Sequence, residues 1–188
     1  MLNLALQALP GNNIKFERRK NNLLFKKIAE EIALAANYHC QYCGIFCQGW
    51  HTAVNIDGDY SNNRHSNLAV ACKLCAGCLL MDQYTVDYVG ENKLIFLPEV
   101  SQTELNLAAV AMARMVKSGG NKEYTLAAKT LYSSLSGRSD FLKNICSSDL
   151  SHPSVFLFIN SNKDNNHELV SGIRLMFSFG DLDGICCD

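Results

Sequence analysis

The chain has 188 residues, of which 48% are hydrophobic and 19% charged, and its formal net charge is −1 at pH 7. This composition is typical of a globular protein and argues against a wholly disordered chain. The small net charge gives no global reason to bind nucleic acid or an anionic membrane. No apolar run reaches the roughly 20 residues of a membrane-spanning helix, and the first residues do not resemble a signal peptide. We therefore expect a soluble, intracellular protein.

Nine cysteines, an odd number, leave at least one thiol unpaired. In a reducing compartment, closely spaced cysteines are more often metal ligands than disulfide partners. Outside the closely spaced groups, we expect Cys146 to be a small buried apolar residue. We expect Cys186 and Cys187, in the segment DGICCD, to be free thiols.

The N-terminal part is predicted to be helical and rich in basic residues. Six Lys or Arg residues and one Glu lie between residues 15 and 27, and we call this stretch the basic segment. We interpret it as a solvated helix face, with a site for an acidic partner as the alternative. An amphipathic helix is predicted for residues 22–37, because apolar residues recur there at helical spacing: Phe25, Ile28, Ile32 and Ala35.

A short strand and a helical hairpin are predicted next. The segment NKLIFLPEV is typical of a strand that ends at Pro98. Ser101 and Glu104 have the spacing of a capping box, and the helix they begin is expected to end at Gly119 and Gly120. The apolar faces predicted for the two helices are Leu105, Ala109, Met112 and Val116, and then Tyr124, Ala128, Leu131 and Leu135, with the second helix ending near Gly137.

The C-terminal part is predicted to add two strands. These are SVFLFI, residues 154–159, and GIRLMFSF, residues 172–179, in which apolar residues alternate. A polar loop is expected between them. The chain is thus predicted to be an α+β protein, a single domain over residues 1–188 with a mainly helical body.

Two matched cysteine pairs carry the clearest chemical signal. Cys40-x-x-Cys43 and Cys72-x-x-Cys75 are separated by 28 residues, and two such turns facing each other close a four-sulfur zinc site. A filled four-cysteine site has no open coordination position, so this zinc would be structural. Four nearby residues are alternative ligands. Cys47 and Cys78 are expected instead to support the site from beside it or to belong to the core, and His39 and His51 are expected to be bystanders.

The segment between the pairs resembles that of a zinc-ribboned HNH endonuclease. A CxxC, a strand entering the loop IDGDYSNN, then SNL, an apolar stretch and a second CxxC make up the resemblance, over residues 38–82. It implies a ββα module. In that family a histidine at the end of the first strand is the general base. An Asp or His just before this base and a later His hold a divalent cation at the scissile phosphate.

Three of those working positions are changed in this chain. Val54 stands where the first metal ligand belongs, Asn55 where the general base belongs, and Ala76 where the last histidine belongs. Valine and alanine cannot coordinate a cation, and a neutral amide is no useful base near pH 7. Asn67 matches the asparagine that organises the loop. The resemblance therefore implies the fold and argues against the activity.

Two rival functions remain open at this stage. One is a divergent metal-dependent nuclease that uses His65, Asp57 and Asp59, although these residues also suit capping or turning of the loop. The other is a nucleic-acid-binding zinc protein. Between Cys40 and Cys78 there are two basic residues, Arg64 and Lys73, and two acidic ones. This lack of excess positive charge argues against phosphate binding.

The whole chain resembles the IcmJ (DotN) family, cytoplasmic subunits of Dot/Icm type IVB secretion systems. The resemblance rests on MLNLALQALPGNNIKFERRK, the two cysteine pairs and NIDGDYSNN. It implies a non-enzymatic adapter that binds the C-terminal extension of the coupling ATPase, with other coupling-complex subunits, and helps present effector proteins. It also implies a cytoplasmic location, peripheral to the bacterial inner membrane through the complex. Neither nucleic-acid binding nor direct membrane insertion is expected.

Overall fold

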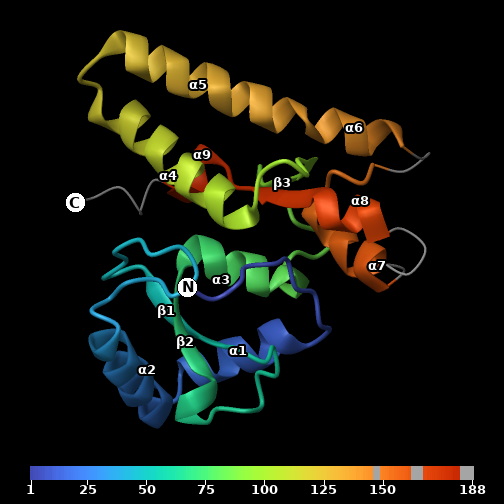
Figure 1. Ribbon diagram of the computed structural model, residues 1–188. Coiled ribbons are helices and arrows are strands. Elements are labelled where there is room, and N and C mark those ends of the chain that lie inside the picture. The colour runs from blue at the N-terminus through green and yellow to red at the C-terminus, as the bar shows by residue number, and fades with distance from the viewer. Residues whose placement is uncertain (146–148, 162–166, 183–188) are drawn as a thin grey trace. The chain divides into compact units, whose positions relative to one another are not determined.

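The computed structural model describes residues 1–145, 149–161 and 167–182. They combine helices with small sheets, which agrees with the predicted α+β class (Figure 1). The chain forms two compact units, Met1–Gln83 and Tyr84–Asp188. The expectation that the chain is one domain stays a prediction. Cys146, Cys186 and Cys187 lie outside the described residues. Within the described ranges, no helix has the length and apolar character needed to cross a membrane.

The first unit, blue to green in Figure 1, contains a β-hairpin followed directly by a helix. Strands β1 and β2 pair antiparallel, from His51 opposite Cys72 to Asn55 opposite Leu68. The order is therefore β1, β2, α3. The bounds are α1 Asn12–Lys20, α2 Leu23–Ala35, β1 His51–Asn55, η1 His65–Asn67, β2 Leu68–Cys72, α3 Lys73–Leu79 and η2 Met81–Gln83.

Helix α2 confirms the amphipathic helix predicted for residues 22–37. The Asn22 side chain accepts hydrogen bonds from the next free amides, including that of Leu24 at 2.9 Å, which is why the helix begins here. Phe25 packs against the hairpin residues Ala53 and Leu68, with Ile28 and Ile32 beside it. The prediction is wrong for one residue of the apolar face, Ala35, which is exposed at the last position of the helix.

The second unit contains a helical hairpin, a two-stranded sheet and several short helices. Strands β3 and β4 pair antiparallel, from Lys93 opposite Met176 to Phe96 opposite Ile173. The bounds are β3 Lys93–Phe96, α4 Gln102–Ser118, α5 Lys122–Gly137, α6 Ser139–Asn144, η3 Pro153–Val155, α7 Phe156–Ser161, α8 His167–Gly172, β4 Ile173–Met176 and α9 Phe179–Leu182.

The predicted capping box and hairpin are confirmed. The Ser101 hydroxyl accepts a hydrogen bond from the Glu104 amide at 3.2 Å, while the Glu104 carboxylate accepts one from the Ser101 amide at 2.8 Å. Helix α4 ends at Gly119, whose φ of +60° is a left-handed conformation that glycine adopts without strain. Helix α5 then returns along α4, as Figure 1 shows.

The face that α5 was predicted to bury is partly wrong. Ala128 and Leu135 contact the core, but Tyr124 and Leu131 are exposed. Tyr132 lies toward the core instead, since its ring stacks on Phe179 with centroids 4.1 Å apart. Two overlapping apolar stripes were available to α5, and the aromatic partner from α9 determines which one is packed.

The prediction of the first C-terminal strand is also wrong. Residues 154–159 lie in η3 and α7, where Phe156 and Ile159 are buried three positions apart, as on a helix face. The turn begins at Pro153, with the His152 side chain accepting from the Ser154 amide at 3.3 Å. The second strand is confirmed as β4, shortened to Ile173–Met176. Helices α7 and α8 extend into both ends of the predicted polar loop, and the middle of that loop lies outside the described residues.

Candidate metal centre

The first cysteine pair lies in a tight turn between α2 and β1. The Gly44 amide donates to the Cys40 carbonyl at 2.8 Å, and the Cys40 amide donates to the Ile45 carbonyl at 2.9 Å. Gly44 has a φ of +75°, which a residue with a Cβ atom rarely adopts. This glycine lets the chain reverse directly after Cys43, so that both thiols of the pair are presented on the same side.

The second pair lies at the junction of β2 and α3. Cys72 is the last residue of β2 and the N-cap of α3, and its sulfur accepts from the Cys75 amide at 3.5 Å. Cys75 follows in the first turn of the helix. The strand-to-helix junction therefore brings the second two thiols together, with the free amides of a helix start close by.

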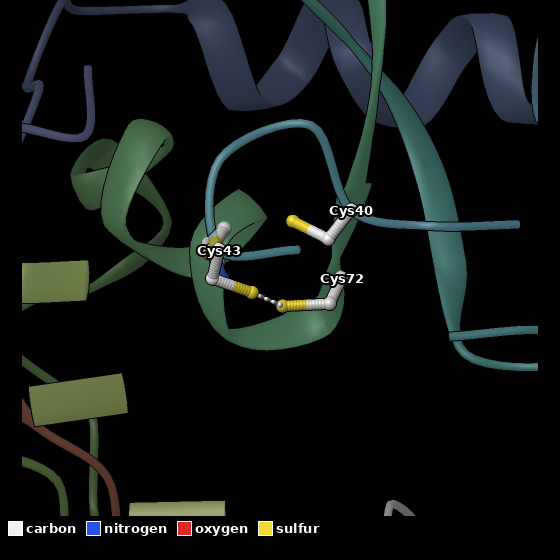
Figure 2. A group of neighbouring side chains, drawn as sticks. Cys40, Cys43 and Cys72 are labelled. Carbon is white, nitrogen blue, oxygen red and sulfur yellow. Dashed lines mark hydrogen bonds between the residues drawn. The ribbon is translucent and has the colours of Figure 1, made fainter. Parts of the chain in front are cut away.

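The two pairs converge on one point. All four sulfurs, of Cys40, Cys43, Cys72 and Cys75, lie within 4.8 Å of one another, and all four residues are buried. The Cys43 and Cys72 sulfurs are 3.8 Å apart, as the dashed line in Figure 2 marks, and Figure 2 shows the Cys40 side chain beside them. A tetrahedral zinc site with Zn–S bonds of about 2.3 Å has S–S edges of about 3.8 Å. The four residues therefore fit a metal ion.

The electrostatics of the four thiols also favour a cation. The pKa of Cys40 is lowered, because Cys43, Cys72 and Cys75 hydrogen-bond to its sulfur. The pKa values of Cys72 and Cys75 are raised, first by Cys40 and then by Cys43. One thiolate in the group thus opposes ionisation of others, and a divalent cation would remove that opposition by attracting all four. The group can hold a metal ion.

The alternative ligands lie outside this group of four sulfurs. The Cys47 thiol donates to the Tyr38 carbonyl at 3.2 Å, and burial raises its pKa to about 12, helped by the charges of nearby Cys40 and Cys43. A thiol with that pKa stays protonated at neutral pH. Cys78 is buried in α3, and His39 Nδ1 donates to the Asn37 carbonyl at 2.8 Å. His51 lies 3.9 Å from Glu30. The choice of ligands stays a prediction.

The N-terminal segment hydrogen-bonds to the first cysteine pair and to the C-terminal end of α3, which sequence reasoning missed. The Leu2 amide donates to the Gln41 carbonyl at 2.7 Å, between the first two cysteines. The Gln7 amide donates to the Cys78 carbonyl at 2.9 Å, and the Gln7 carbonyl accepts from the Met81 amide at 2.9 Å. Its apolar residues Leu2, Leu4, Leu6 and Ala8 alternate along the chain and are buried or half-buried, so an alternating pattern in the sequence could have indicated an extended segment with one inward face.

The position of the expected general base is occupied by a buried amide. Asn55 is 2% exposed, and its side-chain nitrogen donates to the Asp59 carbonyl at 2.8 Å and the Asn62 carbonyl at 2.6 Å. Val54 beside it is fully buried, and Ala76 is buried in α3. These three residues pack the module, and Asn55 holds the loop closed.

Arg19 is buried against this loop, whereas the other five basic residues of the basic segment are exposed, as predicted. Its guanidinium donates to Asn55 Oδ1, to Asn63 Oδ1 at 2.7 Å and to the Ala53 carbonyl at 2.7 Å. Its carbon also lies 4.4 Å from the Phe25 ring centre, within cation–π range. Burial lowers the pKa of Arg19 to about 10. A fixed positive charge thus lies beside Asn55.

The acidic residues of the loop act as local caps, as the sequence suggested. Asp57 accepts from the side chains of Asn67 at 2.9 Å and Asn62 at 2.7 Å, and these bonds, that from Asn67 first, lower its pKa. Asp59 accepts from the Ser61 amide at 2.9 Å. The His65 Nε2 atom lies 3.6 Å from a carboxylate oxygen of Glu31.

Comparison with known proteins assigns the chain to a family. No family model matches it. It is 35% identical over 179 residues to the Type 4 apparatus protein DotN of Legionella pneumophila, covering 92% of this chain and 82% of that protein. Identity at this level, over most of both chains, shows common descent. The chain belongs to the DotN family of type IV secretion apparatus proteins.

Proposed function

We propose that this chain is a non-enzymatic adapter of a bacterial type IVB secretion coupling complex. In this proposal it binds the C-terminal extension of the coupling ATPase on the cytoplasmic side of the inner membrane and helps to recruit effector proteins. Its similarity to the Type 4 apparatus protein DotN is the observation that carries the proposal. The sequence resemblance adds the coupling-complex role.

The first unit contributes a stable platform in this proposal. Zinc is the ion we assign to the four thiolates, because soft sulfur ligands at tetrahedral spacing favour it over magnesium or calcium. The order β1, β2, α3 supports an HNH-like ββα module. Zinc bound by four sulfurs would hold the two cysteine pairs together. It would have no free coordination position for a reacting water.

Several observations support a binding role in place of chemistry at this module. Neither Val54 nor Ala76 can coordinate a cation, and the Asn55 amide is engaged on both sides by hydrogen bonds. The Arg19 guanidinium beside it would repel a divalent cation. A site with this arrangement is expected to hold no catalytic metal.

The outer face of α5 is the surface we assign to the ATPase extension. Leu126 is 67% exposed and Leu131 49% exposed. They line a shallow depression of about 600 Å³. Its lining residues follow helical spacing along one face: Glu123, Leu126, Ala127, Thr130, Leu131 and Ser134. Small residues between leucines permit close approach of an amphipathic partner helix.

A binding measurement with the purified ATPase extension from the same bacterium tests this proposal. We expect Leu126→Asp with Leu131→Asp to weaken binding at least about tenfold, since apolar burial would be lost. Leu34→Asp, an exposed leucine of α2, is the matched control and should bind normally. If the α5 variant binds as tightly as the wild type, the interface lies elsewhere on the chain. If the wild-type chain does not bind the extension, the proposed function is wrong.

A further inference from the structure

The corner between α1 and α2 exposes leucines next to unpaired cations. Leu23 is 75% exposed and Leu24 72% exposed, at the first two positions of α2. Lys26 and Lys27 follow three and four residues after Leu23, and residues that far apart lie on one side of a helix. Arg18, in the last turn of α1, is exposed and adds a third cation. We call these five residues the corner patch.

The corner patch points away from the core of its unit. Phe25, which lies between the leucines and the lysines in sequence, is buried against Ala53 and Leu68. With 100° between successive residues, Leu23 and Lys27 lie nearly opposite Phe25 around the helix. Asn21, Asn22 and both leucines are all exposed, so the corner projects into solvent. The leucines therefore add nothing to the core.

The positive charge of the corner patch is available for an external anion. In the described part of the chain, Arg18, Lys26 and Lys27 have no acidic partner, whereas Lys20 pairs with Glu17 at 2.7 Å. The two carboxylates of α2 follow Lys26 and Lys27 by four residues, one turn along the same side of the helix, and other groups contact both of them. Glu30 accepts from the Tyr38 hydroxyl, and Glu31 lies beside His65. The start of α2 is therefore basic and apolar together.

We propose that the corner patch docks on the anionic phospholipid headgroups of a bilayer. Headgroup phosphates would attract the three cations, and the interfacial region beneath them would accept the two leucines. An acidic protein segment would satisfy the cations but leave the projecting leucines in water unless it also supplied a cavity for them. Docking of this kind is superficial and needs no spanning helix. The proposal is independent of the ATPase surface on α5.

Vesicle binding by the full chain tests the proposal, with phosphatidylcholine vesicles with and without phosphatidylglycerol as the probe. We expect binding only to the anionic vesicles, weakening as salt rises. Removing the three charges by Arg18→Gln, Lys26→Gln and Lys27→Gln should weaken binding by about fivefold for each charge. Leu23→Gln with Leu24→Gln should weaken it by at least about tenfold. Circular dichroism and metal content confirm that each variant is folded.

The matched control removes the same number of charges from the other unit. Arg114→Gln, Lys122→Gln and Lys129→Gln are changes at exposed residues and give the same net charge as the corner variant. This control should bind like the wild type. If it loses as much binding as the corner variant, the attraction is global and the proposal is overturned. Absence of wild-type binding at low salt also overturns it. A third outcome is that the wild type and the leucine variant bind soluble polyglutamate equally well and neither binds vesicles. This would overturn the proposal and indicate an acidic protein partner instead.

Discussion

The interior of Met1–Gln83 contains four clustered cysteines and a buried arginine among its apolar residues, whereas the buried residues described in Tyr84–Asp188 are apolar or uncharged. In the first unit, four buried cysteines and the guanidinium of Arg19 occupy positions between the hairpin and its surrounding helices. In the second, one cluster joins the strands to the hairpin helices through Ile95, Leu97, Leu105, Met112, Ala128 and Met176. Both units thus have an apolar cluster, and they differ in the sulfur group and the charged side chain that only the first is seen to bury among the described residues.

The difference decides how each unit responds to change. A hydrocarbon core gains free energy from many similar contacts, so a volume-conserving substitution costs little. The sulfur cluster and the Arg19 site each depend on a few groups of defined geometry. Removing one partner there leaves a charge or a buried polar group without compensation, which costs more than the lost contact itself. The first unit should therefore be the more sensitive to single substitutions at named positions.

Removal of the metal should produce the largest difference in stability between the two units. Structural zinc binding is worth about 10 kcal/mol in isolated zinc-finger peptides, and a chain with apolar cores will lose less. We expect about one equivalent of zinc, and expect Cys43→Ser or Cys75→Ser to lower metal content and thermal stability. Hydrogen exchange after chelation should show greater loss of protection in β1, β2 and α3 than in α4 and α5.

The control for this experiment is Cys47→Ser, which changes a cysteine outside the group of four sulfurs. It should leave the metal content unchanged. Full zinc content in both ligand variants would mean that Cys47 or Cys78 completes the site. Unchanged melting after complete chelation would contradict a structural role.

Arg19 should show the next largest effect. Arg19→Met keeps much of the apolar stem but leaves Asn55 Oδ1 and the Ala53 carbonyl without their donor, at a cost of about 2–4 kcal/mol. Urea unfolding measures the change in free energy. Arg18→Met is the matched control, because Arg18 is exposed, and it should stay within about 0.5 kcal/mol of wild type. Equal stability of the two variants would show that the buried bonds contribute little.

Much of the helical structure could be predicted because its signals are local. Asn22 begins α2, and Ser101 with Glu104 begins α4, through hydrogen bonds within one turn. The paired CxxC spacing similarly identified four cysteines that the fold brings together. In each case the residues that determine the geometry are neighbours in sequence or repeat a short motif.

The errors arose where distant residues decide between two local options. The apolar run at residues 154–159 suits either a strand or a buried helix, and the turn at Pro153 favours the helix. The packed stripe of α5 is determined by Phe179, far along the chain. Composition alone could not distinguish these outcomes.

Arg19 shows a signal that sequence reasoning overlooked. Asn12, Phe16 and Arg19 are spaced by four and three residues and are the buried residues of α1. The same spacing that identified Phe25 and Ile32 in α2 placed Arg19 on the inner face of α1. The basic residues around it concealed this, because a run of charges is normally solvated.

The smallest expected effect is nuclease activity, which should be absent. Hydrolysis of a phosphodiester by an HNH-like module needs a base and a bound divalent cation. At the corresponding positions this chain presents an engaged amide, Asn55, and the apolar side chains of Val54 and Ala76, while the Arg19 guanidinium lies where a cation would be repelled. Incubation with plasmid DNA or RNA and Mg²⁺ or Mn²⁺ should therefore give no cleavage above a buffer control. Cleavage that co-purifies with the chain and disappears in His65→Ala would make His65 a working base. The first unit would then be an enzyme, and the non-enzymatic adapter proposal would be wrong.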